Sequence, residues 1–158
     1  MEILEGTHSA HDSRFGIVVS KFNELVTDRL LDSALETLRK GGATDKTLKI
    51  VKVPGAFEIP LVARQLAETR QFDAVICLGS VIRGETAHFD YICAETTRGI
   101  ARVALDTGVP IIFGVLTTDT VNQALERAKS PERNRGIHAA QAAMEMATLM
   151  KQLRTLGM

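Results

Sequence analysis

The sequence contains few aromatic residues and few cysteines. Its 158 residues include no tryptophan, one tyrosine and two cysteines. Cys77 and Cys93 form no Cys-x-x-Cys pair, and they fall in an expected strand and an expected helix. We therefore expect two buried, reduced thiols rather than a disulfide or a metal site. His88 is also poorly spaced from Cys93 for holding a shared metal ion.

An excess of charge and a long apolar run are missing as well. Lys+Arg and Asp+Glu number 19 each, which gives no electrostatic reason to expect nucleic acid or an anionic membrane as a partner. No apolar run approaches the roughly 20 residues of a membrane span. The N-terminus lacks the basic and then apolar pattern of a secretory signal. The expected location is the cytoplasm, or an organelle after removal of a transit peptide.

The sequence does contain a regular alternation of apolar strands and amphipathic helices. Strands are predicted for four apolar runs, at residues 15–20, 47–53, 73–78 and 109–116. Helices are predicted for residues 25–38, for the segment after Pro60, for a long segment ending near residue 106, and for residues 120–127 and 136–153. Gly41 and Gly42 are expected to end the first helix.

This order predicts a single α/β domain over residues 1–158. The strands are too apolar to have a solvated face, which favours a parallel sheet with helices on both sides and right-handed crossovers. The expected fold is a flavodoxin-like three-layer αβα sandwich around a central four-stranded parallel sheet. Residues 1–14 lack a clear period and are expected to form a loose N-terminal arm, or a strand added to a neighbouring subunit's sheet.

Ligands of such a fold gather at the carboxyl ends of the strands. The segment from Gly79 to Tyr91 follows the third strand and enters a helix, whose unpaired N–H groups attract a phosphate or an oxyanion. His88, in the first turn of that helix, could move protons near neutral pH. The other candidate binding residues at the strand ends are Phe22, Ala56, Phe57, Glu58, Ser80, Val81, Ile82, Glu85, Thr86 and Phe113.

Several of these residues have an equally simple structural explanation. The ring of Phe22, which lies between two polar residues, is as suited to stacking on a flat heterocycle as to packing. Glu58 near a helix start is commonly explained by the helix dipole. Phe113 lies inside a strand, which by itself favours a place in the core. Arg127 fits the dipole at a helix end, although its guanidinium could also grip a phosphate.

The loop after the third strand argues against nucleotides. The glycine spacing from Gly79 to Thr86 is that of a Walker A loop, but Glu85 occupies the lysine position and would repel the phosphates of ATP or GTP. The GxGxxG fingerprint of dinucleotide-binding folds is missing from every strand–helix junction.

Four segments resemble the motifs of the lumazine synthase family. Residues 15–23, 53–60, 84–91 and 113–120 read FGIVVSKFN, VPGAFEIP, GETAHFDY and FGVLTTDT, and the match covers essentially the whole chain. The resemblance implies condensation of 5-amino-6-(D-ribitylamino)uracil with 3,4-dihydroxy-2-butanone 4-phosphate to 6,7-dimethyl-8-ribityllumazine, with release of phosphate and water. This is the penultimate step of riboflavin biosynthesis, and the resemblance implies no cofactor and no metal.

The resemblance also implies roles for individual residues. Phe22 would stack on the pyrimidine ring, and His88 would shuttle protons during imine formation and phosphate elimination. Arg127 and the backbone at Glu85 and Thr86 would hold the phosphate. The pocket for the ring and the ribityl chain would be lined by Ala56, Phe57, Glu58, Ser80, Val81 and Ile82. Phe113 and the region of Arg127 would come from the neighbouring subunit.

One region departs from the family pattern. After Arg127 the family usually has a glycine-rich stretch that ends in Gly-Asn-Lys-Gly, whereas residues 130–136 here read SPERNRG. Arg135 stands where a lysine is expected to contact the ring substrate. The positive charge is kept, but arginine and lysine differ in geometry. The contact from Arg135 and the conformation of this loop, stiffened by Pro131, are therefore open at this point.

The resemblance further implies a homo-oligomer with active sites between neighbouring subunits. The family forms pentamers, and twelve pentamers often close into an icosahedral shell of 60 subunits, inside which riboflavin synthase is a candidate partner. The loop at residues 130–136 carries no extra residues, which favours the shell. The alanine-rich face of the helix at 136–153 suits contact between subunits and an intramolecular core equally well.

Two functions of other classes fit the same residues. The chain could sequester a flavin without turnover, or it could form a cage whose catalysis is weakened by the altered loop. The presence of both His88 and Arg127 argues against a pure flavin binder, which needs no phosphate clamp beside a proton shuttle. Product formation separates catalysis from both alternatives, and particle mass separates the cage from the binder.

Overall fold

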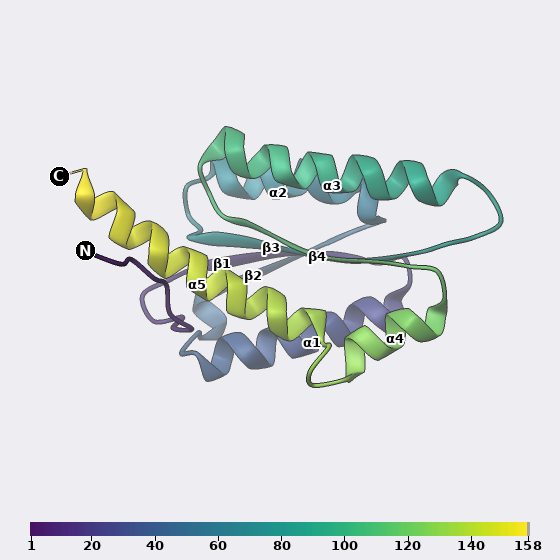
Figure 1. The fold of residues 1–158 in the computed structure, drawn as a ribbon, viewed down its shortest axis with the longest axis horizontal. Coiled ribbons are helices and arrows are strands. Elements are labelled where there is room, and N and C mark those ends of the chain that lie inside the picture. Colours follow the sequence, from purple (N-terminus) through teal and green to yellow (C-terminus); the bar gives the residue numbers. More distant parts are fainter. Residues whose placement is uncertain (158) are drawn as a thin grey trace.

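A four-stranded, all-parallel sheet lies between two layers of helices in the computed structural model, which describes residues 1–157 (Figure 1). The strands are β1 (Phe15–Ser20), β2 (Leu48–Val53), β3 (Ala74–Ile82) and β4 (Ile111–Thr118), in the order β2-β1-β3-β4. The helices are α1 (Glu24–Lys40), α2 (Ile59–Glu68), α3 (His88–Thr107), α4 (Val121–Lys129) and α5 (Arg135–Leu156), with 3-10 turns η1 (Asp45–Thr47) and η2 (Ala56–Glu58). The expected flavodoxin-like α/β sandwich is confirmed.

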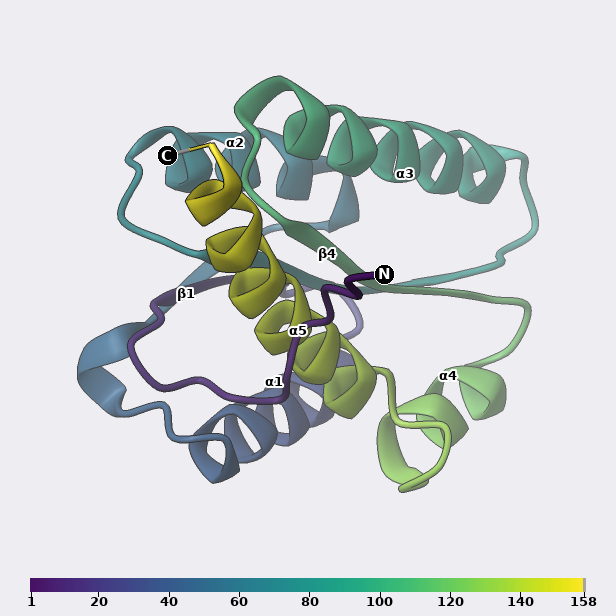
Figure 2. The same cartoon turned by 60° about the vertical axis from the view of Figure 1, so that its left-hand side comes forward.

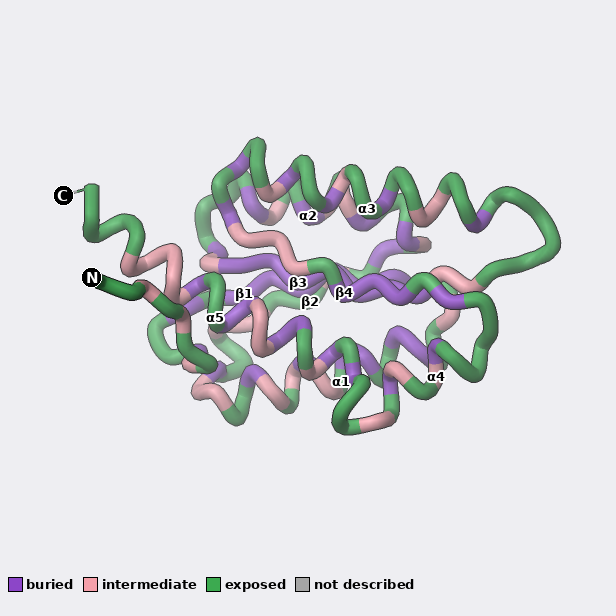
Figure 3. Tube along the Cα trace, viewed as in Figure 1, coloured by how far each residue is buried: buried purple, intermediate pink, exposed green. Residues whose placement is uncertain are grey.

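The two faces of the sheet carry separate apolar cores. Helices α2 and α3 cover one face, and α1, α4 and α5 cover the other (Figures 1 and 2). Alternation along β1 divides its side chains between them, since Ile17 packs in the α1–α5 core and Val18 in the α2–α3 core. The central strands β1 and β3 are buried along most of their length (Figure 3). The edge strand β2 instead exposes Lys49, Ile50 and Lys52, so the expectation that no strand has a solvated face is wrong for β2.

The alanine face of α5 belongs to the intramolecular core. Ala140, Ala143 and Ala147 are fully buried in the same cluster as Leu30 of α1. At Gly136, in the first turn of α5, an added Cβ would collide with the carbonyl oxygen of Leu30. The small residues thus let α5 approach α1 closely, and this packing accounts for the alanine pattern without a second subunit.

Two strands extend further than their apolar runs predict. β3 continues through Gly79 and Ser80 to Ile82, because β4 pairs with it up to the match of Ile82 with Thr118.

The expected capping box is confirmed at the start of α4. Thr120 Oγ1 accepts from the backbone N–H of Gln123 across 3.1 Å, and Gln123 Oε1 accepts from the N–H of Thr120 across 3.2 Å.

The N-terminal residues 1–14 contain no strand and lie along α5. The N–H of Thr7 donates to Thr148 Oγ1 across 2.8 Å, and the amide of Gln152 donates to the carbonyl oxygen of Glu5 across 2.7 Å. These contacts give the arm a defined place on its own chain. The addition of this segment to a neighbouring subunit's sheet stays a prediction.

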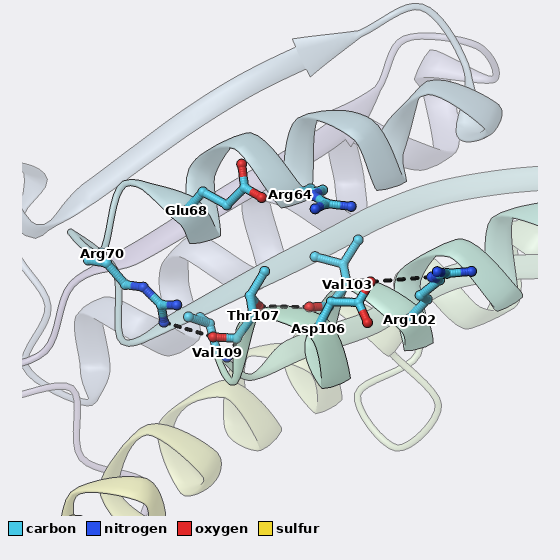
Figure 4. Close-up of polar contacts among 8 residues, drawn as sticks. All are labelled: Arg64, Glu68, Arg70, Arg102, Val103, Asp106, Thr107 and Val109. Carbon is cyan, nitrogen blue, oxygen red and sulfur yellow. Dashed lines mark hydrogen bonds and ion pairs between the residues drawn. The ribbon is translucent and has the colours of Figure 1, made fainter.

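The ends of α2 and α3 are tied together at the edge where the strands begin. Arg70 Nη1 donates to the carbonyl oxygen of Thr107 across 2.7 Å, and Thr107 Oγ1 donates to that of Val103 across 2.7 Å (Figure 4). These contacts fasten the helix layer at the edge opposite the strand ends.

No helix within residues 1–157 is long and apolar enough to cross a membrane. The cytoplasmic location stays a prediction.

Candidate active site

A cavity of about 550 Å³ lies at the carboxyl ends of β1, β2 and β3. We call it the strand-end cavity. Nine of the residues singled out in the sequence line it together, namely Phe22, Ala56, Phe57, Glu58, Ser80, Val81, Ile82, Thr86 and His88. Its volume is in the usual range for a small-molecule site. Glu85 lies in the exposed loop before α3 and lines neither this cavity nor the one described below.

Two aromatic rings in this cavity are largely free of protein contacts. Phe22 is 72% exposed although it follows the buried strand β1, and Phe57, which follows β2, is 58% exposed. Packing within this chain therefore does not explain Phe22, and its stacking on a heterocycle stays a prediction. Exposed rings beside a cavity offer flat apolar surfaces on which a heterocycle can stack.

Backbone hydrogen bonds fix the loop that carries Phe22. The N–H of Lys21 donates to the carbonyl oxygen of Val53 across 2.8 Å, and the N–H of Phe22 donates to that of Pro54 across 3.0 Å. The next residue, Asn23, has a φ of 62° and precedes α1. Its side-chain amide donates to the carbonyl oxygen of Ser80 across 2.7 Å. The loop after β1 is therefore joined to the end of β2 and to Ser80 near the end of β3.

Unused polar groups gather at the end of β3 and the start of α3. Ser80 is 2% exposed, and its Oγ has no hydrogen-bond partner within residues 1–157. It is one of four such buried hydroxyls in the described chain, with those of Ser20, Thr27 and Thr96, and it alone belongs to a residue that lines the strand-end cavity.

His88 is the exposed first residue of α3, and the helix cap, Ala87, provides no side-chain acceptor for the N–H groups of the first turn. Two N–H groups of this turn already have acceptors, since that of His88 donates to Thr86 Oγ1 across 3.4 Å and that of Asp90 donates to the carbonyl oxygen of Ala87 across 3.0 Å. The positive end of the helix dipole still favours an anion here.

A second cavity, of about 530 Å³, lies along β4 and is lined by Phe113, Arg127 and Arg135. We call it the β4 cavity. Phe89 is the one residue that lines both cavities. Phe113 is 44% exposed because β4 is an edge strand, so its position inside a strand does not place it in the core. Within one chain, the predicted site residues are thus divided between two cavities.

Two of the three arginines that line the β4 cavity, Arg127 and Arg135, have no acidic partner in the described part of the chain. Arg127 Nη1 donates to the carbonyl oxygen of Gln123 across 3.3 Å, and neither Arg127 nor Arg135 forms an ion pair within residues 1–157. Asn134 caps α5 by accepting from the N–H groups of Gly136 and Ile137, at 2.9 and 3.2 Å. This cap makes Arg135 the first residue of α5 despite the altered loop before it. Two unpaired guanidinium groups at one cavity are suited to a phosphate.

The comparison with known proteins decides which family has this arrangement. The model of the 6,7-dimethyl-8-ribityllumazine synthase family matches residues 12–151. The chain belongs to this family. Two similar relatives bear the same name: one from Desulfatibacillum aliphaticivorans is 52% identical over 152 residues, and one from Syntrophus aciditrophicus (strain SB) is 54% identical over 151 residues. Each alignment covers 96% of this chain and 98% of the relative.

Three residues that sequence reasoning did not assign to the site belong to the cavities. Asn23 and Phe89 line the strand-end cavity, and Arg83 lines the β4 cavity. An asparagine between a strand and a helix is a recognisable signal, because asparagine favours caps and tolerates positive φ. Phe89 and Arg83 act through tertiary contacts, which leave no periodic pattern in the sequence.

The cysteines of this lumazine synthase family member are both free. Cys77 is fully buried in β3, and burial raises the pKa of its thiol. Cys93 is only partly buried and lines the β4 cavity; burial and then the charge of Asp90 raise the pKa of its thiol, against a lowering effect of Arg83. No group of three or more potential metal ligands occurs within residues 1–157.

Proposed function

We propose that this protein condenses 5-amino-6-(D-ribitylamino)uracil with 3,4-dihydroxy-2-butanone 4-phosphate and releases 6,7-dimethyl-8-ribityllumazine, phosphate and water. The observation that carries this proposal is the strand-end cavity, where exposed aromatic rings and an exposed histidine meet in a member of the lumazine synthase family. This activity is that of a transferase in riboflavin biosynthesis, and it requires no cofactor.

The strand-end cavity would hold the pyrimidine substrate. Phe22 stacks on the flat ring, which is consistent with a side chain that is 72% exposed. The unused Oγ of Ser80 is a hydrogen-bond partner for a polar atom of this substrate. The remaining contacts with the ring and the ribityl chain come from Ala56, Phe57, Glu58, Val81 and Ile82.

The phosphate substrate would be held between the start of α3 and an arginine. The backbone at Glu85 and Thr86 precedes α3 and provides N–H groups near the positive end of the helix dipole. Arg127, which has no ion-pair partner within the described chain, supplies the positive charge. Arg135 adds a second guanidinium in the same cavity and can contact the ring substrate.

The division of these residues between two cavities supports an active site between subunits. Phe113, Arg127 and Arg135 line the β4 cavity, which shares only Phe89 with the strand-end cavity. A neighbouring copy of the chain would bring its β4 cavity to the rim formed by Phe22. The resemblance to the family implies a homopentamer, which we propose for this chain, and we extend the proposal to a 60-subunit shell of twelve pentamers that encloses riboflavin synthase.

The chemistry requires positioning and proton transfer. The amine of the pyrimidine adds to the ketone and loses water to form an imine. Elimination then expels phosphate and leaves an enol that becomes a carbonyl, and the second amine adds to this carbonyl and loses a second water to close the ring. Holding the two substrates together can contribute roughly 7–11 kcal/mol to rate acceleration in well-oriented systems. His88, at the edge of the cavity, accepts and returns the protons of these steps.

The decisive experiment mixes the purified protein with both substrates and follows lumazine absorbance and inorganic phosphate together. Equal amounts of both products are expected. Ligand binding without either product would contradict the proposal and favour a flavin binder or a cage with weakened catalysis. Native mass measurement on the same sample separates these two alternatives and tests the pentamer and the shell.

A further inference from the structure

Arg83 connects three elements that surround the candidate active site. It follows β3, and its backbone N–H donates to the carbonyl oxygen of Thr118 across 2.9 Å. Its Nε donates to Asp119 Oδ1 across 2.8 Å, and its Nη1 donates to Asp90 Oδ1 across 3.3 Å. The guanidinium carbon lies 4.4 Å from the centroid of the Phe89 ring. One side chain thus joins the end of β4 to the first turn of α3.

The loop between β3 and α3 has little else to hold it. Within residues 1–157, no hydrogen bond joins residues 84–87 to an element other than α3. An added Cβ at Gly84 would meet nothing within 4 Å. Arg83 lies at one end of this loop, and its partners Phe89 and Asp90 directly follow His88 at the other end. The arginine therefore fixes the distance between the two ends.

We propose that Arg83 is a positioning residue for the condensation, which holds His88 against the ends of β3 and β4 through its contacts with Phe89 and Asp90. This inference rests on the proposed function. The planar guanidinium suits the task, because it can bind two carboxylates in its plane while its face lies over the ring of Phe89. Phe89 is also the residue that separates the two cavities.

A purely structural role predicts different consequences. Arg83 is 46% exposed, and ion pairs of such exposure contribute little to the free energy of unfolding. A misplacement of catalytic groups by about 1 Å, in contrast, can cost about 10²-fold in rate. Loss of Arg83 should therefore affect catalysis far more than stability, and it should do so only while His88 is present to be positioned.

The test is a double-mutant cycle of Arg83→Ala and His88→Ala, read as kcat/KM for lumazine formation. We expect Arg83→Ala to lower kcat/KM by about 10- to 100-fold in the wild-type background, and by less than about 3-fold in the His88→Ala background. Free guanidinium at low concentration should restore part of the activity of Arg83→Ala, whereas urea at the same concentration should not.

Arg64→Ala is the matched control. Arg64 Nε donates to Glu68 Oε1 across 2.8 Å, the same distance as the bond from Arg83 to Asp119, and its side chain is 51% exposed (Figure 4). It lies on α2 and lines neither cavity. This variant should keep the wild-type kcat/KM, because it loses an equivalent ion pair at a place where nothing catalytic depends on it.

Equal losses in both backgrounds, or no loss on Arg83→Ala, would overturn the positioning role while leaving the condensation intact. If the wild-type protein forms no lumazine, the proposed function fails instead. Should Arg83→Ala not fold, Asp119→Asn carries the same cycle, because it keeps the arginine and removes the charge that receives its Nε–H. Additive losses for Asp119→Asn and His88→Ala would then refute the proposal.

Discussion

Asn23 joins the loop after β1 to the end of β3 through a 2.7 Å hydrogen bond from its side-chain amide to the carbonyl oxygen of Ser80. The same residue has a φ of 62°, in the left-handed region that asparagine tolerates better than most residues. Its neighbour Phe22 is therefore presented to the strand-end cavity by a backbone that is fixed from two directions.

Replacing Asn23 tests this arrangement. Asn23→Ala loses the hydrogen bond and strains the positive φ, so we expect the free energy of unfolding to fall by about 1–2 kcal/mol. Affinity for the pyrimidine substrate should weaken as well, because Phe22 is displaced. Asn23→Gly keeps the backbone conformation and loses only the amide. Urea unfolding and ligand titration should rank glycine between wild type and alanine, and equal values for all three would refute the dual role.

His88→Ala should slow the condensation without abolishing it. Proximity of the two bound substrates supplies much of the rate, and general acid–base catalysis adds a smaller factor. We expect kcat to fall by about 10²-fold at most, the lower end of the range for such groups, with little change in KM for either substrate. Steady-state kinetics measure this division. A complete loss of turnover in a folded variant would show that proton transfer by His88 is indispensable.

Arg127→Ala should weaken binding of the phosphate substrate more than it slows turnover. Its guanidinium lacks an acidic partner within the described chain, so its charge is available to the ligand. We expect KM for that substrate to rise by about 10-fold or more, equivalent to at least about 1.4 kcal/mol, while KM for the pyrimidine changes little. Arg135→Lys, which keeps the charge in the same cavity, is the control. Unchanged affinity on Arg127→Ala would remove Arg127 from the phosphate site.

Gly136→Ala should destabilise the fold. The added methyl group would collide with the carbonyl oxygen of Leu30, where α5 meets α1. Overpacking of this kind costs roughly 1–3 kcal/mol, which thermal or urea unfolding would detect. Gly157→Ala is the control, because its nearest new contact is an ordinary 3.7 Å to the carbonyl oxygen of Arg154. Equal stability of the two variants would contradict the close approach of the helices.

Cys77 should resist alkylation in the native protein. Burial raises its pKa, so at pH 8 the reactive thiolate is scarcer than in an exposed cysteine, and the side chain is also inaccessible. Mass spectrometry after iodoacetamide treatment should find Cys77 unmodified until the protein is unfolded. The pKa of Cys93 is raised as well, so its thiolate fraction is smaller than that of an exposed cysteine at the same pH. Its alkylation rate should therefore keep rising with pH after the rate of an exposed cysteine has levelled off. Rapid native labelling of Cys77 would show that β3 opens to solvent.

Much of the fold and of the strand-end cavity can be predicted from the sequence, because both depend on local patterns. Apolar runs place the four strands, and the capping residues Thr120 and Gln123 place the start of α4. The carboxyl ends of parallel strands meet at one edge of a sheet. The positions of Phe22, Glu58 and Ser80 near the carboxyl ends of three of the strands therefore suffice to assign them to one cavity.

The remainder depends on which surfaces meet. Phe113 is exposed because β4 lies at the edge of the sheet. An apolar segment predicts a strand, but it does not show which strands lie beside it. The alanine face of α5 is compatible with any close helix contact, and only the structure assigns it to α1. Arg83 carries no sequence signal of a site residue, because its partners Asp90 and Asp119 come from two other segments of the chain.

Because residues 1–14 pack along α5, the N- and C-terminal segments of the chain can be joined by protein engineering. The bonds from Gln152 to Glu5 and from Thr7 to Thr148 make the two ends of the chain neighbours, at the end of the molecule opposite the loop before α3 (Figure 1). A short linker could join them and allow the chain to be reopened elsewhere, since circular permutation is tolerated when termini are close. Tags or cargo fused at either terminus would emerge away from the edge of the sheet that carries the strand-end cavity.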